Sequence, residues 1–318
     1  MKKQVITLLF LASACGLAAQ QEQMFTQFMF NKLAYNPAYA GSFVSPTLTA
    51  IYRNQWMGLD GSPKAMSLSY NQATINGRVG VGGNITRQSI GINTNLTIEG
   101  VYAYRIQLKR GTLAAGLQLS LRNIRQNWGD SRIVPIDMND PTIPVDAKSK
   151  LLPNVGAGVY YNAYNERWYA GISVPRVIDN SLDFSEFGNG FSREVQHINA
   201  MGGLQIEATD ELDVTPQVLM RYAFGAPFDA EVNLSALLRN KFYGGLSYRL
   251  GGDNNFAGES VDVALGFQAA DKLFFCFSYD IGLTRLRKFN NGSIEATVRY
   301  WFIAPPDDVA PVKPARPF

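Results

Sequence analysis

The sequence is poor in the residue types on which enzymes and metal sites depend. Its 318 residues include one histidine, His197, and two cysteines. A single histidine without a cysteine pair cannot supply the ligands of a transition-metal site. No G-x-S-x-G motif marks a nucleophilic serine that His197 would activate. We therefore expect no enzymatic activity, no cofactor and no bound metal.

Residues 1–19 have the layout of a secretory signal peptide. Two lysines precede a short apolar run, and small residues extend to Ala19, after which we expect cleavage. In an alternative interpretation, Cys15 is the acylated residue of a lipoprotein box. Cleavage after Ala19 leaves Cys276 as the remaining cysteine, so we expect no intramolecular disulfide.

The chain also lacks a charge excess and a long apolar stretch. Without the two signal lysines, 27 of the 29 basic residues remain against 26 acidic ones. This balance gives no argument for a nucleic-acid partner. Past the signal, no stretch of about 18 uncharged apolar residues predicts a membrane-spanning helix. We expect an exported protein that no helix holds in a membrane.

What the sequence has in abundance is alternation of side-chain character at every second residue, which is the period of a β-strand. In the last such segment, Ile294, Val298 and Tyr300 share one face, while Glu295 and Arg299 share the other. No convincing long helix interrupts the series. Fourteen strands are expected, beginning near residues 47, 65, 78, 95, 112, 155, 167, 196, 212, 230, 241, 261, 272 and 293.

The connections between these strands alternate between short and long. Asn76-Gly77 is a strong two-residue hairpin signal, whereas residues 125–154 and 176–195 form long connections. Outer-membrane barrels sort their loops in this way, with tight turns on the periplasmic side. Together with the signal peptide, this pattern favours a 14-stranded antiparallel transmembrane β-barrel of the outer membrane, residues 47–302, over a soluble all-β protein. Both termini are then periplasmic.

The face that we expect to line the lumen carries nearly balanced charges, which predict cross-strand pairing inside a filled barrel. Its acidic members are Glu99, Asp213, Glu231, Asp262, Asp280 and Glu295, and its basic members are Arg105, Arg122, Arg221, Arg249 and Arg299. After the barrel, residues 303–318 form a proline-rich extended tail. This tail is either a frayed end or a periplasmic tether, and the sequence leaves both open.

Residues 20–46 precede the barrel and are unusually aromatic. Their irregular pattern does not suit a strand in lipid, and burying each large apolar side chain contributes roughly 1.5–3 kcal/mol. The segment therefore either docks on a periplasmic partner or, as we expect, forms a plug in the periplasmic half of the barrel. We expect a bend at Asn36-Pro37, and an exit toward the first strand at Gly41, which can adopt backbone angles closed to other residues. Its packing residues are Phe25, Phe28, Phe30, Tyr35 and Tyr39.

Two N-terminal stretches, "FTQFMFNKLAYNPAYAGS" and "YRNQWMGLDGSPKAMSLSYN", closely resemble the start of the PorP/SprF family of Bacteroidetes type IX secretion. "LPNVGAGVYY", "WYAGISVPRV" and "GSIEATVRYWF" extend the resemblance over the mature chain. The resemblance makes Arg53 and Trp56, in the second stretch, candidates for lining the end of the lumen opposite the plug. One departure is Ile294, where family members often have histidine.

The resemblance implies an outer-membrane protein that assists secretion or surface attachment of type IX cargo, including gliding adhesins. Implied partners are the cargo or its C-terminal domain, periplasmic ring or motor-associated components, and outer-membrane lipid. An alternative is a transport channel for small solutes, similar to FadL-type fatty-acid transporters, in which an N-terminal plug also occurs.

Overall fold

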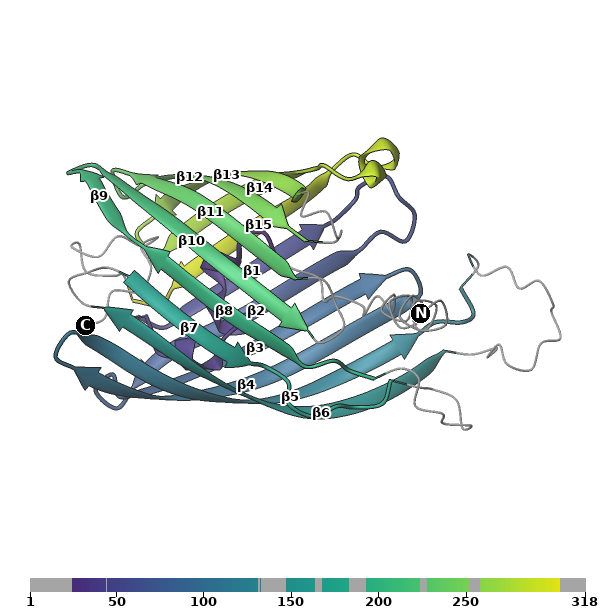
Figure 1. Ribbon diagram of the computed structural model, residues 1–318, viewed down its shortest axis with the longest axis horizontal. Coiled ribbons are helices and arrows are strands. Elements are labelled where there is room, and N and C mark those ends of the chain that lie inside the picture. Colours follow the sequence, from purple (N-terminus) through teal and green to yellow (C-terminus); the bar gives the residue numbers. More distant parts are fainter. Residues whose placement is uncertain are drawn as a thin grey trace, which may run out of the picture.

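A computed structural model describes residues 25–43, 45–130, 132, 147–163, 168–182, 193–223, 228–251 and 258–303. The expected signal peptide and nearly all of the expected tail lie outside this part of the chain. The described residues form one antiparallel β-barrel with strongly tilted strands (Figure 1).

Fifteen strand segments make up the wall. They are β1 (Thr47–Asn54), β2 (Lys64–Thr74), β3 (Val79–Ile90), β4 (Asn93–Leu108), β5 (Gly111–Gln126), β6 (Lys148–Ala163), β7 (Trp168–Val174), β8 (His197–Leu204), β9 (Ile206–Thr209), β10 (Leu212–Ala223), β11 (Asp229–Leu238), β12 (Phe242–Leu250), β13 (Gly258–Ala270), β14 (Leu273–Gly282) and β15 (Ser293–Trp301).

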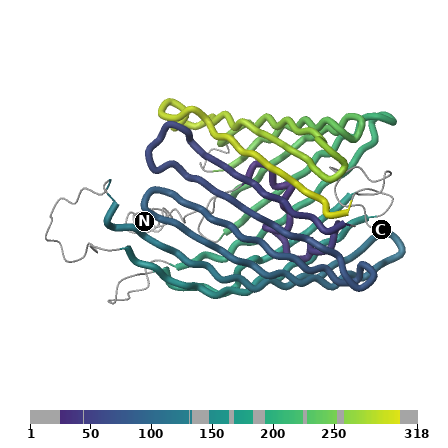
Figure 2. Tube along the Cα trace, turned by 180° about the vertical axis from the view of Figure 1, so that it is seen from behind, coloured from purple at the N-terminus to yellow at the C-terminus, as the bar shows by residue number. Residues whose placement is uncertain are grey.

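The fifteen segments occupy fourteen strand positions around the wall, as the sequence predicts. β8 and β9 share one position, because they lie one after the other beside the same neighbouring strand. Both pair with β10, and Gln205 separates them. Apart from β8 and β9, each strand pairs antiparallel with the next, and β1 pairs with β15 to close the barrel. Thr47 lies opposite Trp301 in this pair. Figure 2 shows the two strands side by side at the seam.

We call the end of the barrel where β1 begins and β15 ends the short-turn end, and the opposite end the long-loop end. At the short-turn end, two residues separate β4 from β5, β9 from β10, and β13 from β14. The long-loop end carries the connection between β1 and β2 and that between β14 and β15. The second of these contains a 3-10 helix, η4 (Arg285–Phe289).

Two strand limits differ from the prediction. β6 begins at Lys148, well before the predicted start near residue 155. Its first residues lack the apolar alternation by which a strand is predicted, because a strand that extends beyond the lipid needs no apolar outer face. β4 begins at Asn93, slightly before the predicted start near residue 95, so only Gly91 and Ile92 separate it from β3 at the long-loop end.

The outer surface of the wall is apolar. Leu117, Leu119 and Leu265 retain 64%, 69% and 68% of their exposure, and similar residues alternate along the other strands. A soluble protein rarely exposes so large a continuous apolar surface, whereas a barrel wall in lipid requires one. None of the helices in the described ranges is long and apolar enough to cross a membrane.

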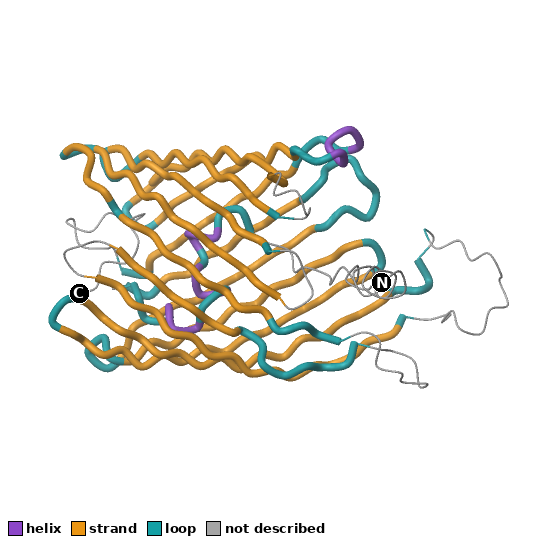
Figure 3. Tube along the Cα trace, viewed as in Figure 1, coloured by secondary structure: helices purple, strands orange, loops and turns teal. Residues whose placement is uncertain are grey.

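The N-terminal residues fill the interior. Three 3-10 turns, η1 (Phe28–Phe30), η2 (Lys32–Ala34) and η3 (Pro37–Tyr39), lie inside the barrel in Figure 3. We call residues 25–43 the lumen segment. Phe28 and Ala38 are completely buried, and they belong to a cluster that also contains inward side chains of the wall. The principal apolar core of this barrel therefore lies between the lumen segment and the wall.

Candidate functional site: the lumen segment and its contacts

The lumen segment begins toward the long-loop end. Phe25 packs with Ile51 and Ala65, and Ala65 is the second residue of β2 after the long loop. Phe25 therefore lies farther from the short turns than the sequence analysis placed it. Phe28, Phe30, Tyr35 and Tyr39 are also buried inside the barrel, between 0% and 7% exposed.

Glu295 fixes the start of the lumen segment. Its two carboxylate oxygens accept hydrogen bonds from the backbone N–H groups of Thr26 and Gln27, at 2.9 and 2.8 Å. Gln27 also donates through its side chain to Ser278 on β14, at 2.9 Å. These backbone donors have no strand or helix partner of their own, so the carboxylate satisfies groups that would be costly to bury alone.

Arg53 connects this start to the wall. Its guanidinium donates to the Thr26 hydroxyl at 2.5 Å, to Asp280 at 2.7 Å and to Glu295 at 3.2 Å. The Arg53 side chain is completely buried. The resemblance to a known family pointed to Arg53 as lining the end of the lumen opposite the short turns. The structure places it there and shows what it contacts.

Arg249 completes this network from the other side of Thr26. It donates to the Thr26 hydroxyl at 3.1 Å and to Glu231 at 2.9 Å. Glu231 and Arg249 are direct partners on β11 and β12, which confirms the predicted cross-strand pairing. The Thr26 hydroxyl in turn donates to Asp262 at 3.3 Å. We call these residues the charged anchor: Thr26, Arg53, Glu231, Arg249, Asp262, Asp280 and Glu295.

Trp56 does not belong to the charged anchor. It lies in the connection after β1, is partly buried, and has a positive φ of 53°. Its backbone N–H donates to the Ser293 hydroxyl at 3.2 Å. Trp56 therefore lies near the long-loop mouth, as proposed, and it contributes to the arrangement of the loop.

The middle of the lumen segment bends at Asn36-Pro37. Asn36 is extended, with φ −142° and ψ 114°, and Pro37 begins η3. The Asn36 side chain accepts from the Ala38 N–H at 2.9 Å and donates to the Val159 carbonyl on β6 at 3.0 Å. The bend therefore has the predicted proline geometry, and Asn36 also attaches it to the wall.

Glycines of the wall make room for the bend. A Cβ atom at Gly116 would lie 2.3 Å from the Ala38 nitrogen and 2.4 Å from the Pro37 carbonyl carbon. Farther along, Gly41 has a φ of +73°, and its Cβ would lie 2.6 Å from the Cα of Gly80. At both places the backbone of the lumen segment lies directly against the backbone of the wall, which is possible only without a side chain.

At the short-turn end the contacts are mainly aromatic. The Phe30 ring lies 5.1 Å from both the Tyr243 and the Phe274 rings. Arg299 donates to the Phe30 carbonyl and lies 4.9 Å from the centre of the Phe43 ring. Ring pairs and stacked cations of this kind contribute about 0.5–2 kcal/mol each beyond the area that they bury.

Lys32 is the one charged side chain of the lumen segment. Only 1% of it is exposed, and its Nζ lies 3.6 Å from the centre of the Tyr169 ring. Burial and repulsion from Arg299 lower the pKa of Lys32 well below its ordinary value. Burial raises the pKa of Tyr39 to about 12. The pKa of Tyr35 is raised for the same reason.

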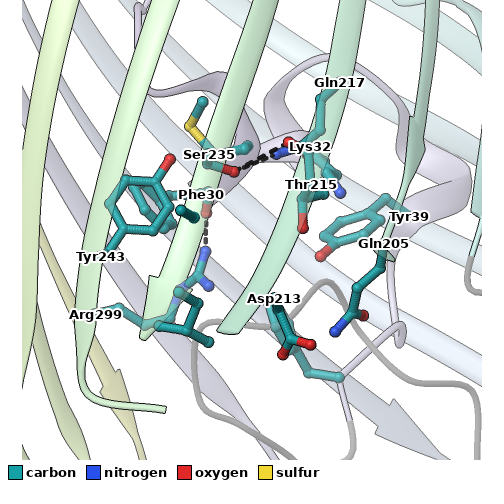
Figure 4. Close-up of a pocket in the computed structure, with 14 residues that line it drawn as sticks. Phe30, Lys32, Tyr39, Gln205, Asp213, Thr215, Gln217, Ser235, Tyr243 and Arg299 are labelled. Carbon is teal, nitrogen blue, oxygen red and sulfur yellow. Dashed lines mark hydrogen bonds between the residues drawn. The ribbon is translucent and has the colours of Figure 1, made fainter. Parts of the chain in front are cut away.

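A cavity of about 30 Å³ remains beside Lys32 at the short-turn end. Figure 4 shows Lys32, Tyr39, Gln205, Asp213 and Arg299 around it, on the lumen segment and on separate parts of the wall. A water molecule needs roughly 10–15 Å³ of such space, so the cavity holds about two waters. No cluster of three or more metal-binding side chains occurs among the described residues.

Sequence reasoning missed the polar residues that hold the lumen segment. It identified the aromatic side chains and assigned Glu295, Asp280 and Arg249 to the inner face. It did not connect these charges with Thr26, Gln27 or Lys32. The available signal was the lone charge at Lys32 within a segment otherwise free of charge, because a buried lysine requires a special environment.

The barrel is closed, has fourteen strand positions and an apolar outer surface, and is filled by its own N-terminal segment. These features place the protein in the class of outer-membrane β-barrel proteins. The chain matches the family described as "Type IX secretion system membrane protein PorP/SprF" over residues 17–300. This match covers most of the sequence, and the chain belongs to that family. Among curated proteins, none matches the sequence.

Two solved structures are similar to this chain at low identity. The toluene transporter TbuX of Ralstonia pickettii superimposes with a TM-score of 0.53 at 10% identity, covering 87% of this chain and 93% of the transporter. A FadL homologue of Pseudomonas aeruginosa matches with a TM-score of 0.45 at 13% identity, covering 87% of this chain and 94% of the homologue. At 10% identity, the first likeness confirms the barrel fold and says nothing of a substrate.

Proposed function

We propose that this protein assists secretion or cell-surface attachment of type IX cargo as a closed barrel that binds a partner and does not conduct. Family membership supports the secretion role. The observation that supports a closed barrel is the lumen segment itself, which Glu295, Arg53 and Arg249 hold through buried polar contacts. A segment held at its start by such contacts and packed along its length is poorly suited to frequent displacement.

In this proposal the short-turn end faces the periplasm, as is usual for outer-membrane barrels. Both the start of β1 and the end of β15 then lie on the periplasmic side. Partners of the secretion apparatus, whether a periplasmic ring or a motor-associated component, have access to this end. The cargo or its C-terminal domain is the other proposed partner, and outer-membrane lipid surrounds the wall.

Deletion of residues 24–41 tests the role of the lumen segment. The wall has its own continuous strand pairing, so we expect the barrel to assemble. Removal of the core between segment and wall should then raise permeability to small antibiotics and weaken cargo display. The measurements are antibiotic susceptibility and surface labelling of cargo, at matched levels of the barrel in the outer membrane.

The substitution His197→Ala tests whether the function of the protein depends on a catalytic histidine. It removes the one imidazole of the chain, and we propose that export of cargo is unchanged, because the protein is not an enzyme. Lost secretion at a normal protein level would reveal a site that we have missed.

If the variant that lacks residues 24–41 assembles, stays impermeable and still displays cargo, the proposed role of the lumen segment is wrong.

A small-solute channel is the second candidate, favoured by the likeness to the barrel of the toluene transporter TbuX. Conductance of the purified protein in planar bilayers distinguishes the two candidates. The secretion proposal predicts a closed wild-type barrel and open channels after deletion of residues 24–41. Steady conductance of the wild-type protein would favour the channel.

A further inference from the structure

The cavity at the short-turn end contains two buried cations and a single carboxylate. Lys32 comes from the lumen segment and Arg299 from β15, and Asp213 is the carboxylate among the lining residues. Lys32 and Arg299 are 1% and 2% exposed. Neither makes an ion pair with any residue in the described ranges, so when both are protonated the cavity has an excess of one positive charge. Buried charges are normally paired.

The hydrogen-bond donors around the cavity are also incompletely used. Lys32 has three N–H donors and makes no side-chain hydrogen bond within the described part of the chain; its contacts are with the Tyr39 and Tyr169 rings. The Gln205 side-chain nitrogen is buried and likewise has no partner among those residues. The unused donors of Lys32 and Gln205, together with the guanidinium of Arg299, are complementary to an anion that accepts several hydrogen bonds.

The shape of the cavity restricts the anion. Its volume of about 30 Å³ holds about two water-sized groups, which corresponds to the two oxygens of a carboxylate. Because the two oxygens fill this space, an apolar group attached to the carboxylate would extend from it toward the short-turn end, with Met29, Phe30 and Phe43 among its neighbours. The cavity also lies at the rim of the barrel, because Asp213 is the second residue of β10 and Arg299 the third from the end of β15.

We infer that this cavity is a binding site for an organic carboxylate that enters from the short-turn end, with Lys32, Arg299 and Gln205 as its donors. Bound carboxylate would neutralise the excess positive charge and use the free hydrogen-bond donors. A free carboxylic acid and the carboxyl terminus of a peptide share this chemistry. The inference does not depend on the proposed role in secretion.

Calorimetric titration of the purified full-length barrel in detergent tests the site with N-acetylphenylalanine as the probe. We expect it to bind, and we expect the uncharged N-acetylphenylalanine amide to bind at least about tenfold more weakly, because charge-assisted hydrogen bonds are lost. Acetate distinguishes the two sources. Equal binding of acetate indicates a free small acid, and binding of the amino-acid derivative alone indicates a peptide end.

The substitution Lys32→Met removes the charge while keeping a long apolar side chain, and it should weaken N-acetylphenylalanine about tenfold or more. Lys241→Met is the matched control, since Lys241 also lies over an aromatic ring, that of Phe242, but is exposed. It should bind as wild type. Equal binding of acid and amide, or unchanged binding by Lys32→Met, would overturn the inference.

A second measurement avoids dependence on folding of the variant. Saturating N-acetylphenylalanine should raise the thermal unfolding midpoint of the wild-type barrel in detergent, because a ligand that binds only the folded state stabilises it. The amide at the same concentration should raise the midpoint less. Equal shifts, or no shift with the acid, would likewise contradict the inference.

Discussion

The two ends of the lumen segment are attached to the wall by different chemistry. At the long-loop end, the charged anchor places two guanidinium groups, those of Arg53 and Arg249, among four carboxylates. At the short-turn end, the cavity places Lys32 and Arg299 beside a single carboxylate. The first end therefore has more acidic than basic groups, and the second has more basic than acidic groups.

The difference indicates a division of roles. Buried ion pairs stabilise little overall but are costly to break, so they are suited to defining position. Aromatic packing contributes stability with less directional demand. The charged anchor therefore determines where the segment begins, and the glycine and aromatic contacts supply most of the burial. The unsatisfied charge at the short-turn end is the part of the lumen left available for a ligand.

The largest effect is expected from breaking the charged anchor. Arg53→Met removes the buried cation of Glu295 and leaves Asp280 with only the longer contact to Arg249, at 3.8 Å. Loss of one partner of a buried ion pair costs about 3–5 kcal/mol. We expect a lower urea midpoint for unfolding in detergent and increased proteolysis within residues 25–43. The double variant Arg53→Met/Asp280→Asn should recover part of the loss, because it removes one carboxylate that has lost its close partner.

Glu211→Gln provides the comparison at the surface. It breaks the ion pair between Arg239 and Glu211, which has a similar length, 2.9 Å, but whose side chains are 67% and 59% exposed. Exposed pairs of this kind contribute at most about 1 kcal/mol. If Arg53→Met and Glu211→Gln shift the urea midpoint equally, the charged anchor does not define the position of the segment.

A smaller effect is expected from closing the space at the bend. Gly116→Ala places a Cβ against the backbone of Pro37 and Ala38, and the required shift should cost about 1–3 kcal/mol. Gly100→Ala is the matched control on β4, where a Cβ has nothing within 4 Å. It should be neutral or stabilise by up to about 1 kcal/mol, because glycine weakens a strand. Urea unfolding of both variants measures the contrast, and similar shifts would contradict close backbone packing.

The sequence predicted the wall much better than the contacts inside it. Period-two alternation at residues such as Ile294 and Glu295 is a local property, and it was sufficient for strand number, pairing order and inner face. The partner of Glu295 could not be predicted in this way, because Thr26 is 269 residues away from it and lies in a segment without a regular period. The bend at Asn36-Pro37 was predictable, since proline restricts its own φ and its neighbour.

The smallest predicted effect is the pH dependence of stability that arises at the short-turn end. The pKa of Lys32 is lowered in the barrel from its ordinary value of 10.5, so between the lowered pKa and 10.5 the folded protein binds fewer protons than the unfolded chain. Its stability therefore rises with pH across this window. Tyr39 acts in the opposite direction, because its pKa is raised from 10.0 to about 12. Its contribution is complete below about 10 and is lost between 10 and 12.

Thermal unfolding in detergent, measured from neutral pH to pH 11, separates these contributions. In wild type, the contribution of Lys32 should raise the unfolding midpoint with pH up to 10.5, where the lysine of the unfolded chain also loses its proton. The contribution of Tyr39 should lower the midpoint above about pH 10. Lys32→Met should lack the rise, and Tyr39→Phe should reduce the later fall. Because the two variants report on the same end of the lumen segment, the difference from wild type is informative even where other groups titrate. Identical pH profiles for wild type and Lys32→Met would mean that Lys32 is already paired with an anion in the purified protein, or that its ammonium is not confined as described. Repeating the titration after exhaustive dialysis distinguishes these two explanations, since only a bound anion can be removed.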